Sequence, residues 1–373
     1  MERIAIIGGG PGGLMLARLL QLRGFSPVVF ERDQHAAERP QGGSLDLHGQ
    51  TGQRALRLAG LENAFIAASR PEHQGDRLYD SAGTLLFDRD DPADDRPEID
   101  RTALRRILLD SLEPGTVRWG QKISQIAAVE RGFAVIGPDW RAEFDVVVGA
   151  DGAWSRVRPL LSEAIPAYEG VTLVELGFDA GQHPAVHALT GSGKMFAVGD
   201  NRALITQRNG FGHIRGYAGL RLSEAIARQW QTMPPAQVRM ALAQAFAGWA
   251  PGLLALVETG TFLGVRPLYA LPVGHCWQSR AGLTLLGDAA HLMSPFAGEG
   301  VNLALADAAD LAEALTETMT EAPDWAAVTR YEETICARAA IAAEGAAQGL
   351  NGAFSSRGVS PVLEHYRARV RDA

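Results

Sequence analysis

The sequence predicts an α/β protein in which a Rossmann-like nucleotide-binding domain is interleaved with a mainly antiparallel sheet. A βαβ pattern with a glycine-rich turn opens the chain over residues 3–31. Short segments punctuated by Gly and Pro, several of them alternating, fill residues 166–279. Buried-strand patterning resumes at 283–287. The nucleotide-binding part is therefore expected to be assembled from segments on both sides of the middle sheet.

Each element follows from a local pattern. Residues 3–7 form a continuous apolar run, as in a strand buried within a parallel sheet. Residues 14–24 carry apolar side chains at helical spacing and end at Gly24, and 27–31 form the next strand. The same patterns predict helices over 53–69, 102–112 and 324–350, and buried strands over 144–152 and 283–287.

Composition narrows the class of protein. The chain has 373 residues, of which 46% are hydrophobic and 21% charged, as in an ordinary globular protein. A net charge of −8 argues against nucleic acid as a partner. No apolar run has the length of a membrane span, and the N-terminus enters a strand at once, without the pattern of a signal peptide. We therefore expect a cytoplasmic monomer that acts on a small molecule.

Cysteine usage adds one expectation. The two cysteines, Cys276 and Cys336, are far apart and in no C-x-x-C arrangement, which excludes a disulfide framework and a zinc ribbon. Both are predicted to be reduced thiols.

The first motif is the turn "GGGPGG" over residues 8–13. Its pattern is Gly8-x-Gly10-x-x-Gly13, in which the first glycine permits a tight turn, the second lets the backbone approach a pyrophosphate, and the third allows close packing of helix on strand. Glu31 ends the next strand, where a carboxylate can accept hydrogen bonds from ribose hydroxyls. Arg32, directly after it, is expected either to touch the adenine end of a dinucleotide or to be solvated.

The second motif is "VVVGADGAWSRVR", residues 146–158. Asp151 and Gly152 end a buried strand, and Ser155 and Arg158 open the next element. An Asp-Gly turn of this kind is common by itself, but it is specific in combination with the first motif.

The third motif is "LTLLGDAAHLMSPFAGEGVNLALADAADLAEAL", residues 283–315. Asp288 ends a buried strand and is placed to bind a sugar or polyol hydroxyl. The following turn can bring the N–H groups of Gly298 and Gly300 to a flavin pyrimidine edge or a phosphate. For His291 a structural role is favoured over acid–base catalysis.

These three motifs, in this order, resemble those of the FAD-dependent aromatic hydroxylases, the single-component flavoprotein monooxygenases. The stretches 41–61 and 97–119 further resemble the TetX-type tetracycline-inactivating monooxygenases. The resemblance implies a GR2-type FAD domain, a substrate-domain sheet over the flavin, and a C-terminal helix bridging the two. The implied boundaries are 1–71, 98–165 and 280–322 for the FAD domain, 72–97 and 166–279 for the substrate domain, and 323–373 for the helix.

The resemblance also implies the residues that contact FAD. Asp46 and Arg101 would lie against the flavin with Arg105 close by, Glu31 and Arg32 would hold the adenosine part, and Asp288, Pro295 and Gly298 would line the ribityl and isoalloxazine portions. The complete predicted cofactor set is Gly8, Gly10, Pro11, Gly13, Glu31, Arg32, Asp46, Arg101, Arg105, Asp151, Asp288, Pro295, Gly298, Gly300 and Val301.

The substrate residues depart from the TetX pattern. Leu173 and Glu175 stand where that family has an Asn and a Gln, and Arg215 stands where it has a His, with His213 two residues away. A Glu/Arg pairing within the pocket is the alternative role for Glu175 and Arg215. The predicted substrate-binding set is Glu175, Phe196, Arg215, Phe296 and Ala297. For any one of Phe196, Phe211, Tyr217 and Phe296, a position in the core is the expectation.

The implied reaction is hydroxylation of an aromatic or polyketide-like molecule through a flavin 4a-hydroperoxide, with FAD as cofactor, NAD(P)H as transient co-substrate and O2 consumed. Tetracycline is one candidate substrate. No metal and no catalytic side chain is assigned. The principal alternative is an FAD-dependent reductase or dehydrogenase without oxygen transfer. A plain NAD(P)-dependent dehydrogenase would leave 146–158 and 287–302 without a role, and the Trp-x-Trp-x-Ile-Pro signature of flavin halogenases is absent from the sequence.

Overall fold

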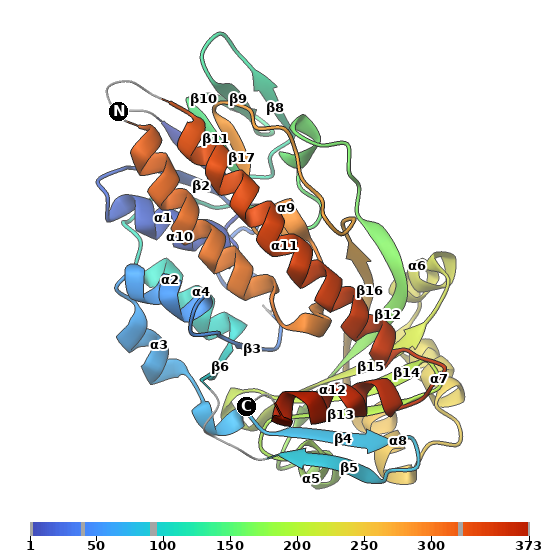
Figure 1. Cartoon of the computed structure of the whole chain (residues 1–373). Helices are drawn as coiled ribbons and strands as arrows, with labels where there is room; N and C mark the ends of the chain where they lie inside the picture. Colours follow the sequence, from blue (N-terminus) through green and yellow to red (C-terminus); the bar gives the residue numbers. More distant parts are fainter. Residues whose placement is uncertain (1–2, 39–41, 90–94, 320–323, 372–373) are drawn as a thin grey trace. The chain divides into compact units, whose positions relative to one another are not determined.

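The structure is a computed structural model that describes residues 3–38, 42–89, 95–319 and 324–371 (Figure 1). The chain divides into two compact units, each made of segments that alternate along the sequence. Unit 1 consists of Met1–Ala68, Arg101–Ala167 and Ala270–Ala346, and unit 2 of Ser69–Asp100, Tyr168–Tyr269 and Ala347–Ala373. The predicted α/β fold with interleaved segments is confirmed.

Unit 1 is built on a parallel sheet. Within the described residues this sheet has five strands in the order β17-β11-β1-β2-β7, and each strand pairs in parallel with its neighbours. β1 is buried along its whole length, as its sequence "IAII" predicts. The strands are β1 (Ile4–Ile7), β2 (Val28–Phe30), β7 (Val117–Arg118), β11 (Val146–Gly149) and β17 (Leu283–Leu285).

Helices pack around this sheet. α1 (Pro11–Gln21) packs against α10 (Gly300–Thr318), and α10 runs beside α11 (Ala326–Ala353) (Figure 1). The helical region predicted over 53–69 is two helices, because Gly60 adopts a left-handed φ of 72° between them. The remaining elements of unit 1 are β3 (Ser44–Asp46), α2 (Gly52–Leu58), α3 (Glu62–Ala68), α4 (Arg101–Asp110), β8 (Gln125–Ala128), β9 (Phe133–Ile136), β10 (Arg141–Phe144), η2 (Arg158–Leu160), α9 (Asp288–His291) and η4 (Pro295–Ala297).

Unit 2 is built on a larger sheet whose order, over the part of the chain described, is β16-β12-β15-β14-β13-β4-β5. The pairs β12–β15, β15–β14, β14–β13 and β4–β5 are antiparallel, as predicted, whereas β13 and β4 are parallel. The strands are β4 (Asp76–Asp80), β5 (Leu85–Arg89), β12 (Ala167–Asp179), β13 (Lys194–Gly199), β14 (Arg202–Arg208), β15 (His213–Arg221) and β16 (Thr261–Ala270), with β6 (Glu98–Asp100) outside this sheet.

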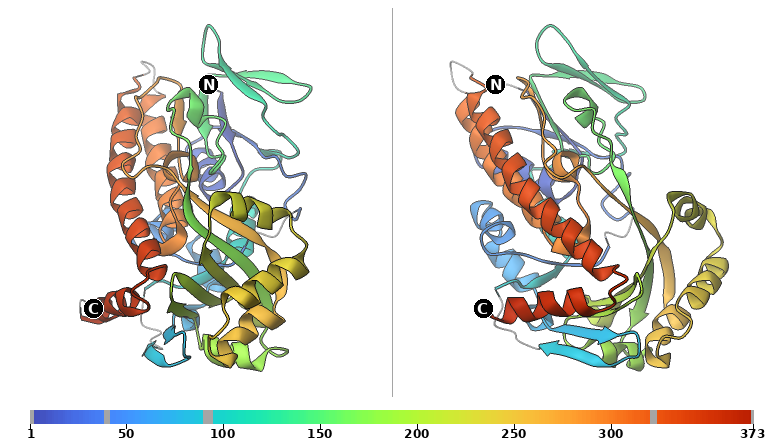
Figure 2. Two further views of the ribbon diagram at one scale, coloured as in Figure 1. Left: turned by 90° about the vertical axis from the view of Figure 1, so that its right-hand side faces the viewer. Right: turned by 45° about the vertical axis from the view of Figure 1, so that its right-hand side comes forward.

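One face of the unit 2 sheet forms the core of the unit. Alternate strand residues such as Val174, Met195 and Leu204 are buried there against helices. Figure 2 shows α6–α8, in yellow, gathered on this side of the sheet. The helices and turns of unit 2 are η1 (Pro71–His73), α5 (Pro184–Thr190), η3 (Gly210–Gly212), α6 (Glu224–Thr232), α7 (Pro235–Ala245), α8 (Pro251–Thr259) and α12 (Ser360–Arg371). The predicted single C-terminal helix is thus two helices, α11 and α12.

Candidate flavin and substrate sites

The glycine-rich turn joins β1 to α1 with a backbone that only glycine permits at two positions. A Cβ on Gly8, whose φ is 111°, would lie 2.3 Å from the Ala150 carbonyl oxygen, and a Cβ on Gly13 would lie 2.2 Å from the Gly8 carbonyl oxygen. A Cβ on Gly10 would meet no described atom within 4 Å. α1 begins at Pro11 without a side-chain cap, so its first N–H groups remain available. Open space beside uncapped N–H groups fits a pyrophosphate.

Glu31 follows β2 directly and holds this turn in place. One of its carboxylate oxygens accepts a hydrogen bond from the Gly9 N–H at 2.7 Å, and the other accepts one from the Asp33 N–H at 3.0 Å. Glu31 is buried, whereas the neighbouring Arg32 is exposed. The structure therefore brings Glu31 to the glycine turn and leaves Arg32 at the surface.

Arg105 is buried close to the same segment. It donates hydrogen bonds to the Ala36 carbonyl at 2.8 Å and to the Asp33 carboxylate at 3.4 Å, and its guanidinium lies 5.4 Å from the centre of the Trp119 ring. Its buried Nε has no hydrogen-bond partner within the described part of the chain. An orphaned cationic N–H of this kind fits an anionic ligand such as a dinucleotide phosphate.

Arg101 contacts the segment of residues 42–46, and Asp46 is the last residue of that segment. The Arg101 N–H donates to the Gly43 carbonyl at 3.2 Å. Asp46 is the last residue of β3, and a Cβ on Gly298 would lie 3.5 Å from its Oδ1. Asp46 and Gly298, predicted to line the flavin, are therefore neighbours in space.

Two residues of this cluster were missed by sequence reasoning. The buried Asn302 side chain donates to the Asp46 carbonyl at 3.0 Å and to the Gly298 carbonyl at 3.2 Å, and its Oδ1 accepts from the His48 N–H at 2.9 Å. Asn302 thus joins β3 to the turn before α10. Its place in "EGVNLAL" beside the glycines is the only local signal in the sequence.

His48 sits between two carboxylates. Its Nε2 is 3.4 Å from Asp46 Oδ2, and its Nδ1 is 3.5 Å from Glu299 Oε2. Burial opposes the charged form, but the hydrogen bonds to Asp46 and Glu299 outweigh it and raise the pKa of His48 to about 9. His48 is therefore an imidazolium at neutral pH, bridging β3 and the start of α10.

The second motif forms a self-contained turn after β11. The Asp151 carboxylate accepts a hydrogen bond from the Arg156 N–H at 2.6 Å, and the Ser155 hydroxyl oxygen accepts one from the Arg158 N–H at 3.0 Å. Burial raises the pKa of Asp151, against the opposing effect of its hydrogen bonds. The other oxygen, Oδ1, is buried and has no partner among the described residues. Buried Arg158 donates to the Ala289 carbonyl at 3.0 Å, which ties this turn to α9.

The third motif presents Asp288 to solvent. β17 and the residues through Gly287 are buried, as are Ala289 and Ala290, whereas Asp288 is exposed. Pro295 is the first residue of η4, and Gly298, which follows η4, takes a left-handed φ of 70°. Gly300 and Val301 form the first turn of α10. A polyol hydroxyl therefore has access to the Asp288 carboxylate.

The predicted substrate residues of unit 2 share one face of its sheet. Cross-strand register aligns Phe196 with Ile205, Ile205 with Tyr217, and Tyr217 with Glu175. Arg215 lies two residues along β15 from Tyr217, and therefore on the same face of the sheet. Except for Glu175, these side chains are half-buried, in contrast to the fully buried opposite face. Phe296 and Ala297 lie in η4 of unit 1.

Glu175 is paired, though not with Arg215. Its Oε2 accepts a hydrogen bond from Arg266 at 3.1 Å. His213 begins β15 and is exposed, two residues before Arg215 and on the same face, while Leu173 is buried. The alternative expectation that Glu175 pairs with Arg215 is therefore wrong, because the arginine that bonds Glu175 is Arg266 on β16.

The expectation that the four aromatic residues lie in the core is wrong. Phe196, Tyr217 and Phe296 are half-buried, and Phe211 is 96% exposed on η3. The reason is that the core of unit 2 occupies the opposite, helix-covered face of the sheet. His291, in contrast, is buried and contacts Asp307. This agrees with the structural role that the sequence favours for His291.

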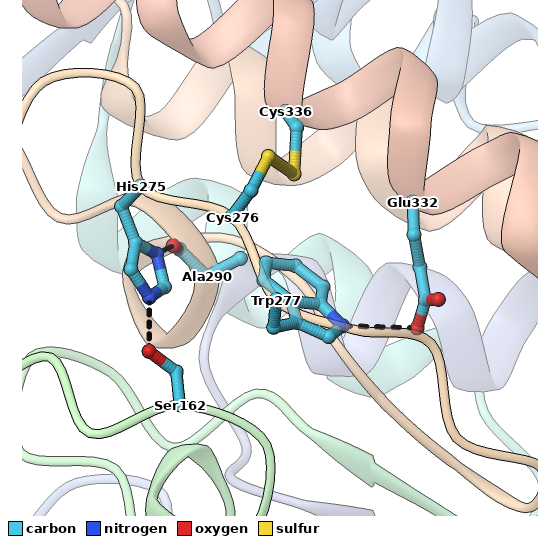
Figure 3. Close-up of a disulfide and its surroundings, with 7 residues drawn as sticks. All are labelled: Ser162, His275, Cys276, Trp277, Ala290, Glu332 and Cys336. Carbon is cyan, nitrogen blue, oxygen red and sulfur yellow. Dashed lines mark hydrogen bonds between the residues drawn. A yellow bond between two sulfur atoms is a disulfide. The ribbon is translucent and has the colours of Figure 1, made fainter.

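The expectation of two reduced thiols is also wrong. Cys276, in the loop before β17, and Cys336, on α11, form a disulfide with their Cα atoms 5.7 Å apart (Figure 3). Long-range packing brings together two residues that are 60 positions apart in the sequence. In the next residue, Trp277, the indole N–H donates to Glu332 of α11 at 3.1 Å.

Across residues 3–38, 42–89, 95–319 and 324–371, no group of three or more His, Cys, Asp or Glu side chains could hold a metal ion. Over the same ranges, no helix combines the length and apolar character needed to cross a membrane.

Known proteins share both the sequence and the fold. Residues 2–346 match the FAD binding domain family. Monooxygenase asqM of Emericella nidulans is 31% identical over 95% of this chain and 96% of that protein. The 3-amino-4-hydroxybenzoate 2-monooxygenase PtmB3 of Streptomyces platensis is 29% identical over 89% of this chain and 83% of that protein.

Solved structures give the same result for the fold. A putative FAD-containing monooxygenase of Photorhabdus luminescens is 25% identical with a TM-score of 0.80, covering 95% of this chain and 99% of that one. The tetracycline destructase Tet(55) is 20% identical with a TM-score of 0.78, covering 99% and 94%. The protein therefore belongs to the FAD binding domain family, and it is an FAD-dependent monooxygenase.

Proposed function

We propose that the protein hydroxylates an aromatic or polyketide-like small molecule, with NAD(P)H as the transient electron donor and O2 as the oxygen source. The observation that carries the substrate class is the half-buried face of the unit 2 sheet, where Phe196, Ile205 and Tyr217 stand in one row and Arg215 in the next. A planar ring gains contact area from the aromatic side chains. A guanidinium recognises a carboxylate or a phenolate on such a ring.

In this proposal unit 1 holds the cofactor. The glycine turn and the start of α1 take the pyrophosphate, Glu31 and Arg105 take the adenosine side, and Asp288 takes the ribityl chain. Asp46, Gly298 and Val301 surround the ring system. When bound and reduced, FAD supplies the activation of O2 for transfer of one oxygen atom. The side chains of the protein position the reactants, and none is required as a nucleophile.

Arg215 sets the preference among rings. An anionic aromatic acid, the kind of substrate named for PtmB3, fits a face that carries this arginine. Tetracycline is a second candidate, which the fold shared with Tet(55) supports at the level of architecture alone.

The experiment supplies FAD-loaded protein with NADPH or NADH under isotope-labelled dioxygen and offers hydroxybenzoates, aminohydroxybenzoates and tetracycline in parallel. Mass spectrometry should detect the gain of one labelled oxygen atom on an aromatic acid. Arg215→Gln should raise KM for the anionic ring by roughly tenfold or more while changing kcat little. His213→Gln, at the exposed neighbouring position, is the matched control and should leave KM unchanged. Flavin reduction without labelled product from any ring would favour a reductase instead.

A further inference from the structure

The segment that presents Asp288 is too short to hold its own conformation. α9 is four residues long, and a single helical turn is unstable without tertiary support. Gly287, which precedes it, has φ 57° and ψ −143°, a conformation that side-chain-bearing residues rarely adopt. The position of the exposed Asp288 carboxylate therefore depends on whatever fixes α9 from outside.

Asp307 of α10 fixes both ends of α9. This aspartate is completely buried, and its Oδ2 accepts a hydrogen bond from the Gly287 N–H at 2.9 Å. The same oxygen accepts one from His291 Nε2 at 2.6 Å. One carboxylate oxygen thus bonds the residue before α9 and the last residue of the helix. Burial of Asp307 opposes its charged form, but the charges of His291 and Arg338 and the hydrogen bonds from His291 and Gly287 together outweigh it and lower the pKa of Asp307.

The other oxygen of Asp307 connects α9 to the C-terminal helix. Arg338 of α11 donates to Asp307 Oδ1 at 2.8 Å and to Asp310 at 2.9 Å. Asp310 in turn bonds Arg54 of α2 at 3.0 Å. Arg338 therefore neutralises a carboxylate that would be costly to bury alone. Asp310 belongs to the same ion network but makes no bond to α9 among the described residues, and its side chain is 25% exposed.

Two backbone carbonyls of α9 are also bonded. The Ala289 carbonyl accepts from Arg158, and the Ala290 carbonyl is 2.7 Å from His275 Nδ1 (Figure 3). On the strand side, Tyr331 of α11 donates to the Leu285 carbonyl at 3.0 Å. These bonds hold α9 at several points, while the Asp288 side chain is exposed.

We propose that Asp307 is a positioning residue for FAD: its buried carboxylate, neutralised by Arg338, sets the place and direction of the Asp288 carboxylate. The inference rests on the proposed function in taking Asp288 as a ligand of the ribityl chain. It makes α11, which contributes no residue to the predicted cofactor set, part of the cofactor-binding apparatus.

The test measures FAD affinity of the full chain by quenching of flavin fluorescence, together with thermal stability in the absence of FAD. Asp307→Asn should bind FAD about tenfold to a hundredfold more weakly, since it loses the charge that holds His291 and Gly287. Asp310→Asn is the matched control within the same network and should bind FAD within about threefold of the wild type. Leu311→Ala, a buried residue of α10, supplies a variant destabilised by a cavity alone.

The double variant Asp307→Asn, Arg338→Gln keeps the test decisive if the single variant folds poorly, because it removes the partly buried arginine charge that Asp307 no longer balances. Its stability should recover while its FAD affinity stays low. The inference is overturned if either Asp307 variant binds FAD as the wild type does. It is also overturned if Leu311→Ala loses as much FAD affinity as Asp307→Asn at equal stability. A wild-type chain that fails to bind FAD would instead refute the proposed function.

Discussion

Substituting Gly10 by alanine should separate cofactor binding from folding. Gly10 has φ −77° and ψ 176°, which alanine adopts freely, and a Cβ there meets no described atom within 4 Å. The cofactor-free protein should therefore be as stable as the wild type or more stable by about 0.4–1 kcal/mol, because alanine restricts the unfolded chain. The added methyl group instead occupies the space assigned to the pyrophosphate. Displacing that group from two backbone N–H donors, at about 1.5 kcal/mol each, corresponds to roughly a hundredfold loss of FAD affinity.

The matched control is Gly13→Ala, three residues further along. Its Cβ would lie 2.2 Å from the Gly8 carbonyl oxygen, so α1 must move and the cofactor-free protein should lose about 1–3 kcal/mol of unfolding free energy. Urea unfolding measures the stability of each variant, and fluorescence titration measures FAD affinity. If Gly10→Ala binds FAD within about threefold of the wild type, the space beside Gly10 is not the pyrophosphate site and the reasoning fails.

Three further outcomes are expected. His48, with a pKa raised to about 9 from 6.5, should stabilise the fold fully below pH 6.5 and lose that contribution as pH rises toward 9; after discounting for partial exposure it amounts to roughly 1–2 kcal/mol. His48→Gln should abolish this slope in unfolding free energy between pH 6 and 10, and an unchanged slope would place its origin elsewhere. Reducing the Cys276–Cys336 disulfide, which closes a loop of 60 residues, should cost up to about 4 kcal/mol. The melting temperature should fall with dithiothreitol in the wild type but not in the double serine variant. Glu31→Gln should weaken FAD binding about tenfold by loosening Gly9, and an unaltered affinity would assign Glu31 to folding alone.

The local parts of the cofactor region could be predicted because they depend on neighbours in the sequence. Gly8 and Gly13 are required by backbone conformation and close approach, and both requirements are visible in a strand–turn–helix pattern. His48 and Asn302 could not be found this way, because their hydrogen bond joins positions 254 residues apart. In the sequence Asp307 is only an acidic residue within an apolar helix. Its hydrogen bonds to Gly287 and to His291 of α9 are visible only in the fold.

The middle of the chain shows a different limit. Alternation predicted strands over 166–279, and the sheet is there, but α5–α8 between the strands were not foreseen. An alternating strand also does not reveal which of its faces a helix layer covers. For that reason the sequence could not decide between the core and the substrate face for Phe196 and Tyr217.

The order of the parallel strands brings three acidic turns, far apart in the sequence, to one edge of the sheet. β17, β11, β1 and β2 are successive neighbours, all parallel, so the residues that follow them lie along one edge of the sheet. The acids there are used differently. Glu31 bonds Gly9 and shapes the turn, and Asp151 bonds the backbone of its own loop. Of the three, Asp288 alone is exposed, and its support comes from a fourth acid buried behind it. An anionic cofactor can therefore bind at this edge, because two of the three carboxylates are engaged with backbone N–H groups while the uncapped start of α1 supplies positive potential.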